Sequence, residues 1–115
     1  AFRGVLCDAL AGFGFKVHQA GDGGEALELI AAQPMHFVLL DLHMPRVTGL
    51  DALRRLLEFP DRPPCALMSA ELTDEIVAEA RQMQVYRVLS KPFRVSQIRE
   101  IVCGALAETY GWKPV

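Results

Sequence analysis

The sequence predicts an α/β fold in which a mostly parallel sheet lies between layers of helices. Segments with the apolar spacing of an amphipathic helix alternate with short strand-like runs over most of the 115 residues. Two of these runs, residues 37–40 and 65–68, are apolar throughout, as expected for interior strands covered on both faces. The order is a helix and then repeated pairs of strand and helix, which is typical of a doubly wound sheet.

The first part of the chain shows local signals for each element. Apolar residues recur at helical spacing from residue 2 to residue 10, and two glycines then end that helix. Residues 15–19 alternate between apolar and polar side chains, which predicts a half-exposed edge strand. Asp22 and Glu25 resemble a capping box and predict the start of the next helix. The buried stripe of that helix is Ala26, Leu27 and Ile30.

Capping signals also mark the helices that follow the two apolar strands. Thr48 and Asp51 predict the start of one helix, whose inward residues are Leu50, Leu53, Leu56 and Leu57. Thr73 predicts the cap of the next helix, which carries Ile76, Val77 and Ala80.

Residues 85–89 alternate again and predict a second edge strand. The last helix is defined by Ile98, Val102, Ala105 and Leu106. We expect one domain over residues 1–110, followed by a tail or linker over residues 111–115.

Composition excludes several classes of protein. The formal net charge is −2, with 14 acidic and 12 basic residues and no basic cluster, so direct binding to nucleic acid is not expected. No apolar run approaches the length of about 20 residues that a membrane helix needs. Cys7, Cys65 and Cys103 are odd in number and widely spaced, which indicates free or buried thiols in a reducing cytoplasm.

Three polar side chains follow three successive predicted strands. Asp41 ends the first apolar run, Ser69 ends the second, and Lys91 follows the run at 85–89. Ligands of open α/β sheets bind beyond the carboxyl ends of the strands. A carboxylate, a hydroxyl and an amine that converge there predict a site for one phosphoryl group.

These residues lie in segments that resemble the response-regulator receiver domain, the phosphoacceptor half of two-component signalling. The matching segments are Asp41-Leu42-His43-Met44-Pro45 with Gly49, Met68-Ser69-Ala70, Lys91-Pro92-Phe93, and Gly21-Asp22-Gly23 with Glu25-Ala26-Leu27. The resemblance covers about residues 1–108. It implies a flavodoxin-like, doubly wound, five-stranded parallel sheet with strand order 2-1-3-4-5.

The resemblance implies a role for each site residue. Asp41 is the phosphoacceptor and holds Mg²⁺ together with the backbone carbonyl of His43. Lys91 and Ala70 bind the phosphoryl group, and Ser69 is the switch hydroxyl. The side chains of His43 and Glu71 tune the phosphoryl lifetime, although both also suit exposed loop positions. The Lys91-Pro92 peptide bond is expected to be cis.

The resemblance also implies partners. The phosphoryl donor is a sensor histidine kinase or a phosphotransfer protein, and the output is a downstream protein or output domain. The helix from Thr73 and the strand from Val85 are expected to form the face that binds it. A homodimer is compatible with this scheme. The only chemistry catalysed is the domain's own phosphoryl transfer and dephosphorylation, in the cytoplasm.

The sequence departs from the receiver pattern in two places. Receivers carry an acidic, metal-binding pair at the end of a first strand, whereas this sequence begins inside the first helix. We expect that strand to exist upstream of Ala1 and to pack between the segments at Phe15 and Phe37; a domain-swapped or truncated form is the alternative. The switch position three residues before the lysine usually holds an aromatic residue and here holds Val88. Tyr86 is two residues earlier, on the same strand face if the run alternates.

Two other functions fit parts of the pattern. A pseudo-receiver would keep the fold and dock a partner without phosphorylation, and the absent acidic pair is the feature that decides between the two. A haloacid-dehalogenase-like phosphatase also uses an aspartate after an apolar strand. Its motif needs a second aspartate two residues later, where this sequence has His43.

Overall fold

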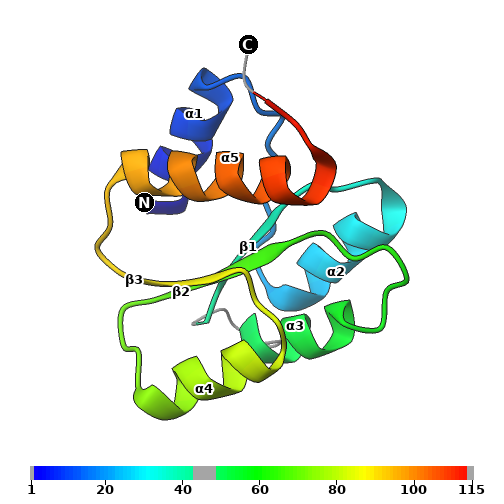
Figure 1. Ribbon diagram of the computed structural model, residues 1–115, viewed down its shortest axis with the longest axis vertical. Helices are drawn as coiled ribbons and strands as arrows, with labels where there is room; N and C mark the ends of the chain where they lie inside the picture. The colour runs from blue at the N-terminus through cyan, green and yellow to red at the C-terminus, as the bar shows by residue number, and fades with distance from the viewer. Residues whose placement is uncertain (1, 43–48, 114–115) are drawn as a thin grey trace.

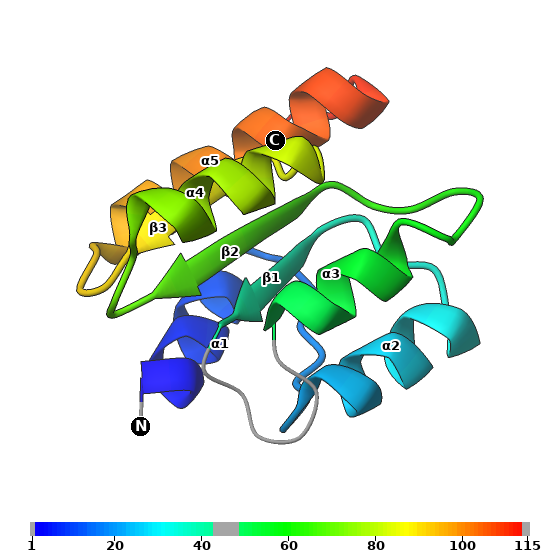
Figure 2. The ribbon, with the colours of Figure 1, turned by 90° about the horizontal axis from the view of Figure 1, so that it is seen from below.

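The structure is a computed structural model that describes residues 2–42 and 49–113. The elements in chain order are α1 (Phe2–Gly12), α2 (Gly23–Ala32), β1 (Val38–Asp41), α3 (Gly49–Leu56), β2 (Cys65–Ser69), α4 (Asp74–Gln82), β3 (Arg87–Ser90) and α5 (Val95–Tyr110). The described strands form one parallel sheet in the order β1-β2-β3 (Figure 1). Helices α1 and α5 cover one face of this sheet, and α2, α3 and α4 cover the other (Figures 1 and 2).

Local capping explains where two of the helices begin. The carboxylate of Asp22 accepts a hydrogen bond of 2.9 Å from the backbone N–H of Glu25, and the Glu25 side chain accepts one of 3.0 Å from Gly21 N–H. The hydroxyl of Thr73 accepts a hydrogen bond from Ile76 N–H at 3.2 Å. Both predicted helix starts are confirmed. The predicted cap residue Thr48 lies outside the described residues.

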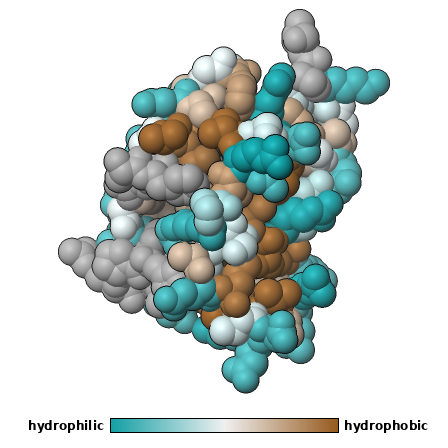
Figure 3. All heavy atoms as spheres, turned by 90° about the vertical axis from the view of Figure 1, so that its left-hand side faces the viewer, coloured by the Kyte–Doolittle hydropathy of each residue, from teal (hydrophilic) through white to brown (hydrophobic). Residues whose placement is uncertain are grey.

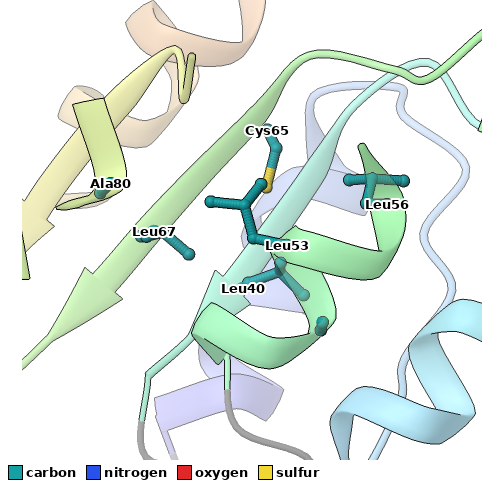
Figure 4. Close-up of a cluster of buried hydrophobic side chains, with 7 residues drawn as sticks. Leu40, Leu53, Leu56, Cys65, Leu67 and Ala80 are labelled. Carbon is teal, nitrogen blue, oxygen red and sulfur yellow. The ribbon is translucent and has the colours of Figure 1, made fainter. Parts of the chain in front are cut away.

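Two apolar clusters fill the space between the sheet and its helices. The cluster toward α2, α3 and α4, which we call the α3 cluster, is built around Leu40, Ala52, Leu53, Leu56, Cys65, Leu67 and Ala80 (Figure 4). The cluster toward α1 and α5, which we call the α5 cluster, is built around Leu6, Met68, Leu89, Ile98, Val102 and Leu106. β2 supplies both clusters and is buried along its whole length, which confirms its predicted interior position.

The segment at residues 15–19 is not a strand, so this prediction was wrong. Phe15 and Val17 are half-buried and Lys16 and His18 are exposed, so the expected alternation of burial is present. A strand, however, also requires a neighbour for its backbone hydrogen bonds, and no described strand pairs with this segment. The Phe15 ring instead packs on the α5 cluster and on Trp112, with ring centroids 5.8 Å apart.

The prediction that both apolar strands are interior is also wrong for β1. In the described sheet β1 lies at the margin, and Val38 and Leu39 are only half-buried. The expected strand between Phe15 and Phe37 is not found among the described residues. The edge position of β3 is confirmed.

The expected alternation over residues 85–89 is broken near Tyr86. Val85 and Val88 both pack on the α3 cluster although they are three positions apart. Tyr86 precedes β3, and its hydroxyl oxygen lies 2.9 Å from the position that a Cβ would occupy at Gly104 of α5. Tyr86 therefore extends toward α5 while Val88 packs on the opposite layer.

Candidate functional site

Three parallel strands end together and bring Asp41, Ser69 and Lys91 to the same end of the sheet. In the sheet register, Asp41 lies beside Met68 and Ser69 lies beside Ser90. The ladder continues one residue further, because Lys91 N–H donates to the Ser69 carbonyl at 2.8 Å. This confirms the prediction that Asp41, Ser69 and Lys91 lie together at one end of the sheet. Figure 3 shows this side of the molecule, where hydrophobic side chains form a band between hydrophilic ones.

An ion pair crosses the end of β2 and joins the two outer strands. The Nζ atom of Lys91 lies 2.5 Å from the Oδ2 atom of Asp41, and each side chain is about one-quarter exposed (24% and 25%). Neighbouring strands are about 4.8 Å apart, so only a long side chain reaches from β3 to the end of β1. The Asp41 carboxylate therefore lies at a point that solvent reaches in part.

The hydroxyl of Ser69 is buried and already has a hydrogen-bond donor. Ser69 has no exposed surface, and its Oγ atom accepts a hydrogen bond of 3.0 Å from Glu71 N–H. Ala70 and the side chain of Glu71 are exposed. This hydrogen bond links the loop before α4 to the site, because a displacement of the Ser69 oxygen toward Asp41 would lengthen its contact with Glu71 N–H.

The other predicted site residues occupy different environments. The Lys91-Pro92 bond is cis, which confirms the prediction. Val88 is half-buried and packs on the α3 cluster. Tyr86 does not replace the missing aromatic residue, because it extends toward α5 near the beginning of β3, away from the strand end that carries Lys91. His43 lies outside the described residues.

Sequence reasoning missed one set of contacts between the two helices that follow β1 and β2. Arg54 of α3 forms ion pairs with Asp51, at 2.9 Å, and with Glu79 of α4. The spacing of Asp51 and Arg54 is a recognisable i, i+3 pair on a helix. The contact with Glu79, 25 positions away, has no local signal in the sequence.

Comparison with known proteins places this geometry in one family. The model of the response regulator receiver domain matches residues 1–103. The chain belongs to this family. The chemotaxis-receiver-like prediction is supported by a curated relative, the probable chemotaxis protein CheY of Rhizobium etli. It is 34% identical over 110 residues, which cover 90% of this chain and 85% of that protein. The regulatory protein AtoC of Escherichia coli is 35% identical, and the match covers 90% of this chain but only 23% of AtoC.

Solved structures confirm the predicted flavodoxin-like receiver fold. A response regulator from Burkholderia pseudomallei, with a phosphorylated aspartic acid, a calcium ion and citrate, has a TM-score of 0.80 and 25% identity. The match covers 99% of this receiver and 69% of that chain. The receiver domain of the sensor histidine kinase PA1611 from Pseudomonas aeruginosa, with magnesium in its active-site cleft, has a TM-score of 0.82 and 21% identity, with coverage of 91% and 88%. The helices of this receiver that the structure describes include none that is long and apolar enough to cross a membrane.

Proposed function

We propose that Asp41 of this receiver accepts a phosphoryl group from the phosphohistidine of a sensor kinase or phosphotransfer protein. The ion pair with Lys91, at 2.5 Å, is the observation that carries the proposal. It supports the proposal because a carboxylate of the kind that acts as a nucleophile lies with a compensating ammonium at the end of the sheet where ligands of this fold class bind.

The chemistry follows from the side chains present. A carboxylate oxygen of Asp41 attacks the phosphorus atom, and the P–N bond to the donor imidazole breaks. The electron pair of that bond returns to the ring nitrogen, so a ring that is protonated on its other nitrogen leaves as neutral imidazole. The product is an acyl phosphate, whose negative charge moves from the carboxylate to the phosphoryl oxygens. Lys91 can follow that charge because its side chain already reaches across β2. Ala70 follows Ser69 directly, so its backbone N–H is available to the same oxygens.

A divalent cation fits this site through Asp41. Mg²⁺ in proteins is commonly bound by one or two carboxylates and keeps several water ligands. We assign Asp41 to the ion because its carboxylate lies at the end of the sheet and is partly exposed. Among the described residues there is no group of three or more side chains of the metal-ligating types. The backbone carbonyl of His43 is proposed as a second ligand. When bound, the ion neutralises charge on the phosphoryl group.

The switch is the exchange of one hydrogen bond at Ser69. In the structure its hydroxyl oxygen accepts from Glu71 N–H, and in the phosphorylated state the hydroxyl donates to a phosphoryl oxygen instead. Loss of the first bond releases the loop at residues 70–73 and shifts α4, which follows it. The shifted α4 and β3 form the face that a downstream protein or output domain binds, in the cytoplasm.

The lifetime of the acyl phosphate is set by the access of water. Glu71 is exposed two positions after the switch hydroxyl, and His43 follows Asp41 at the same distance in sequence. We propose that both side chains border the path of the attacking water. The receiver thus catalyses only its own phosphorylation and dephosphorylation.

Intact-mass measurement after incubation with Mg²⁺ and acetyl phosphate tests the proposal. The receiver should gain one phosphate that hydroxylamine removes, as expected for an acyl phosphate. Asp41→Asn should gain none, whereas Asp8→Asn, which changes an exposed carboxylate on α1, should be labelled like the parent. Undiminished labelling of Asp41→Asn overturns the assignment. A complete absence of labelling in the parent favours the phosphorylation-independent pseudo-receiver.

A further inference from the structure

Helix α4 buries fewer apolar residues in the α3 cluster than its neighbour α3 does. Ala80 is the one residue of α4 that is buried, and Ile76 and Val77 are half-buried. Its neighbour α3 contributes Ala52, Leu53 and Leu56 to the same cluster, each 1–2% exposed. Since buried apolar area is the main stabilising term in packing, α4 can move at lower cost than α3.

A bridge of charged groups connects these two helices on their outer surface. The Nη1 atom of Arg54 lies 2.9 Å from Asp51 Oδ1, and its Nη2 atom contacts Glu79 Oε1. We call these contacts the Arg54 bridge. Asp51 fixes the guanidinium on the first turn of α3, so the second contact ties the latter half of α4 to a well-packed helix (Figure 1).

We propose that the Arg54 bridge is a latch that holds α4 in the arrangement seen here and opposes its shift when Asp41 is phosphorylated. This inference rests on the proposed function, because it concerns the movement that phosphorylation drives. When Ser69 releases Glu71 N–H, the loop and α4 move together, and Glu79 moves relative to Arg54. The contact between Arg54 and Glu79 is therefore broken when the activated state forms.

The strength of the latch follows from its exposure. The side chains of Arg54 and Glu79 are 52% and 41% exposed, and ion pairs at such positions are weak and screened by salt. The bridge thus changes the equilibrium between the arrangement of α4 in this structure and the shifted arrangement, and it does not prevent the shift. We expect its removal to change that equilibrium about two- to five-fold, with a smaller effect at high salt.

Titration with beryllofluoride, followed by amide NMR shifts of α4, tests the latch in the presence of Mg²⁺. Arg54→Gln and Glu79→Gln should each lower the midpoint about two- to five-fold. The double variant should show no further change, because both substitutions remove the same contact. Arg55→Gln is the matched control, since Arg55 is the exposed neighbouring arginine on α3. Equal effects of Arg54→Gln and Arg55→Gln, or additive effects in the double variant, overturn the latch.

Hydrogen exchange of the unphosphorylated receiver separates this inference from the proposed function. The α4 amides should exchange about two- to five-fold faster in Arg54→Gln and Glu79→Gln than in the parent and in Arg55→Gln. Unchanged exchange in both variants contradicts the latch, whatever the response to beryllofluoride. Faster exchange in a receiver that does not bind beryllofluoride supports the Arg54 bridge as a contact that holds α4, but it contradicts phosphorylation at Asp41 and with it the role of the bridge in the switch.

Discussion

The contact between Tyr86 and Gly104 predicts a strong coupling between β3 and α5. A Cβ atom at residue 104 would lie 2.9 Å from Tyr86 Oη, closer than van der Waals contact allows. The backbone of Tyr86 is held in place because its N–H donates to the Cys65 carbonyl at 2.7 Å, and the Arg87 guanidinium lies 4.6 Å from the centroid of the tyrosine ring. Gly104→Ala should therefore force a local displacement of α5 or of the tyrosine.

Two opposing terms determine the size of the effect. Overpacking costs roughly 1–3 kcal/mol, while replacing glycine with alanine inside a helix gains about 1 kcal/mol. Gly104→Ala should thus destabilise the receiver by about 0–2 kcal/mol. In a Tyr86→Phe background the obstructing oxygen is absent, so the same substitution should stabilise by up to about 1 kcal/mol.

Urea unfolding followed by circular dichroism measures the effect of Gly104→Ala on the free energy of unfolding, with Tyr and with Phe at position 86. The double-mutant cycle of these two positions should give a coupling of about 1–3 kcal/mol. Gly4→Ala is the matched control, because Gly4 is also helical and nothing lies within 4 Å of its Cβ position. It should have the same stabilising effect in both backgrounds. If Gly104→Ala is equally costly with Phe at position 86, the steric explanation is wrong.

Three further predictions concern the site and its surroundings. Ser69→Ala should still be phosphorylated, but the beryllofluoride-induced shift of the α4 amides should weaken; an unchanged shift would exclude the hydroxyl as the switch. Val88→Ala should cost roughly 1–2 kcal/mol in urea unfolding, and loss of the beryllofluoride response in a folded variant would give Val88 a direct role. Burial raises the pKa of the Cys65 thiol to about 12 from 9.0. The folded state then holds this proton more tightly, so the thiol's contribution to stability is complete below pH 9 and decreases as the pH rises toward 12. Dithionitrobenzoate at pH 8 should label Cys7 and Cys103 in the native receiver and Cys65 only after unfolding; rapid native labelling of Cys65 would contradict this.

The convergence of Asp41, Ser69 and Lys91 could be predicted because it depends on topology alone. Parallel strands joined by helices end at the same side of the sheet, and each of these residues ends or follows an apolar run. Their chemical roles remain proposals. Geometry adds what sequence could not show, namely that Lys91 pairs with Asp41 and that Ser69 is fully buried with Glu71 N–H as its donor.

The errors arose where a pattern was local and the structure depended on distant segments. Residues 15–19 alternate as a strand does, but a ladder needs a neighbour that no local pattern supplies. The alternation at 85–89 placed Tyr86 with Val88, whereas Tyr86 precedes β3 and reaches α5. The contact of Arg54 with Glu79 joins two helices 25 positions apart, so it too required the fold.

The division of the interior into two clusters affects how this receiver can vary during evolution. Substitutions in the α5 cluster, at Ile98 or Val102, affect a layer that does not move in the proposed switch. Selection therefore acts on them through the stability of the fold. Substitutions in the α3 cluster, at Leu53 or Ala80, change the surface on which α4 moves in the proposed switch. A lineage can therefore adapt its thermal tolerance through one side of the sheet and its signalling threshold through the other.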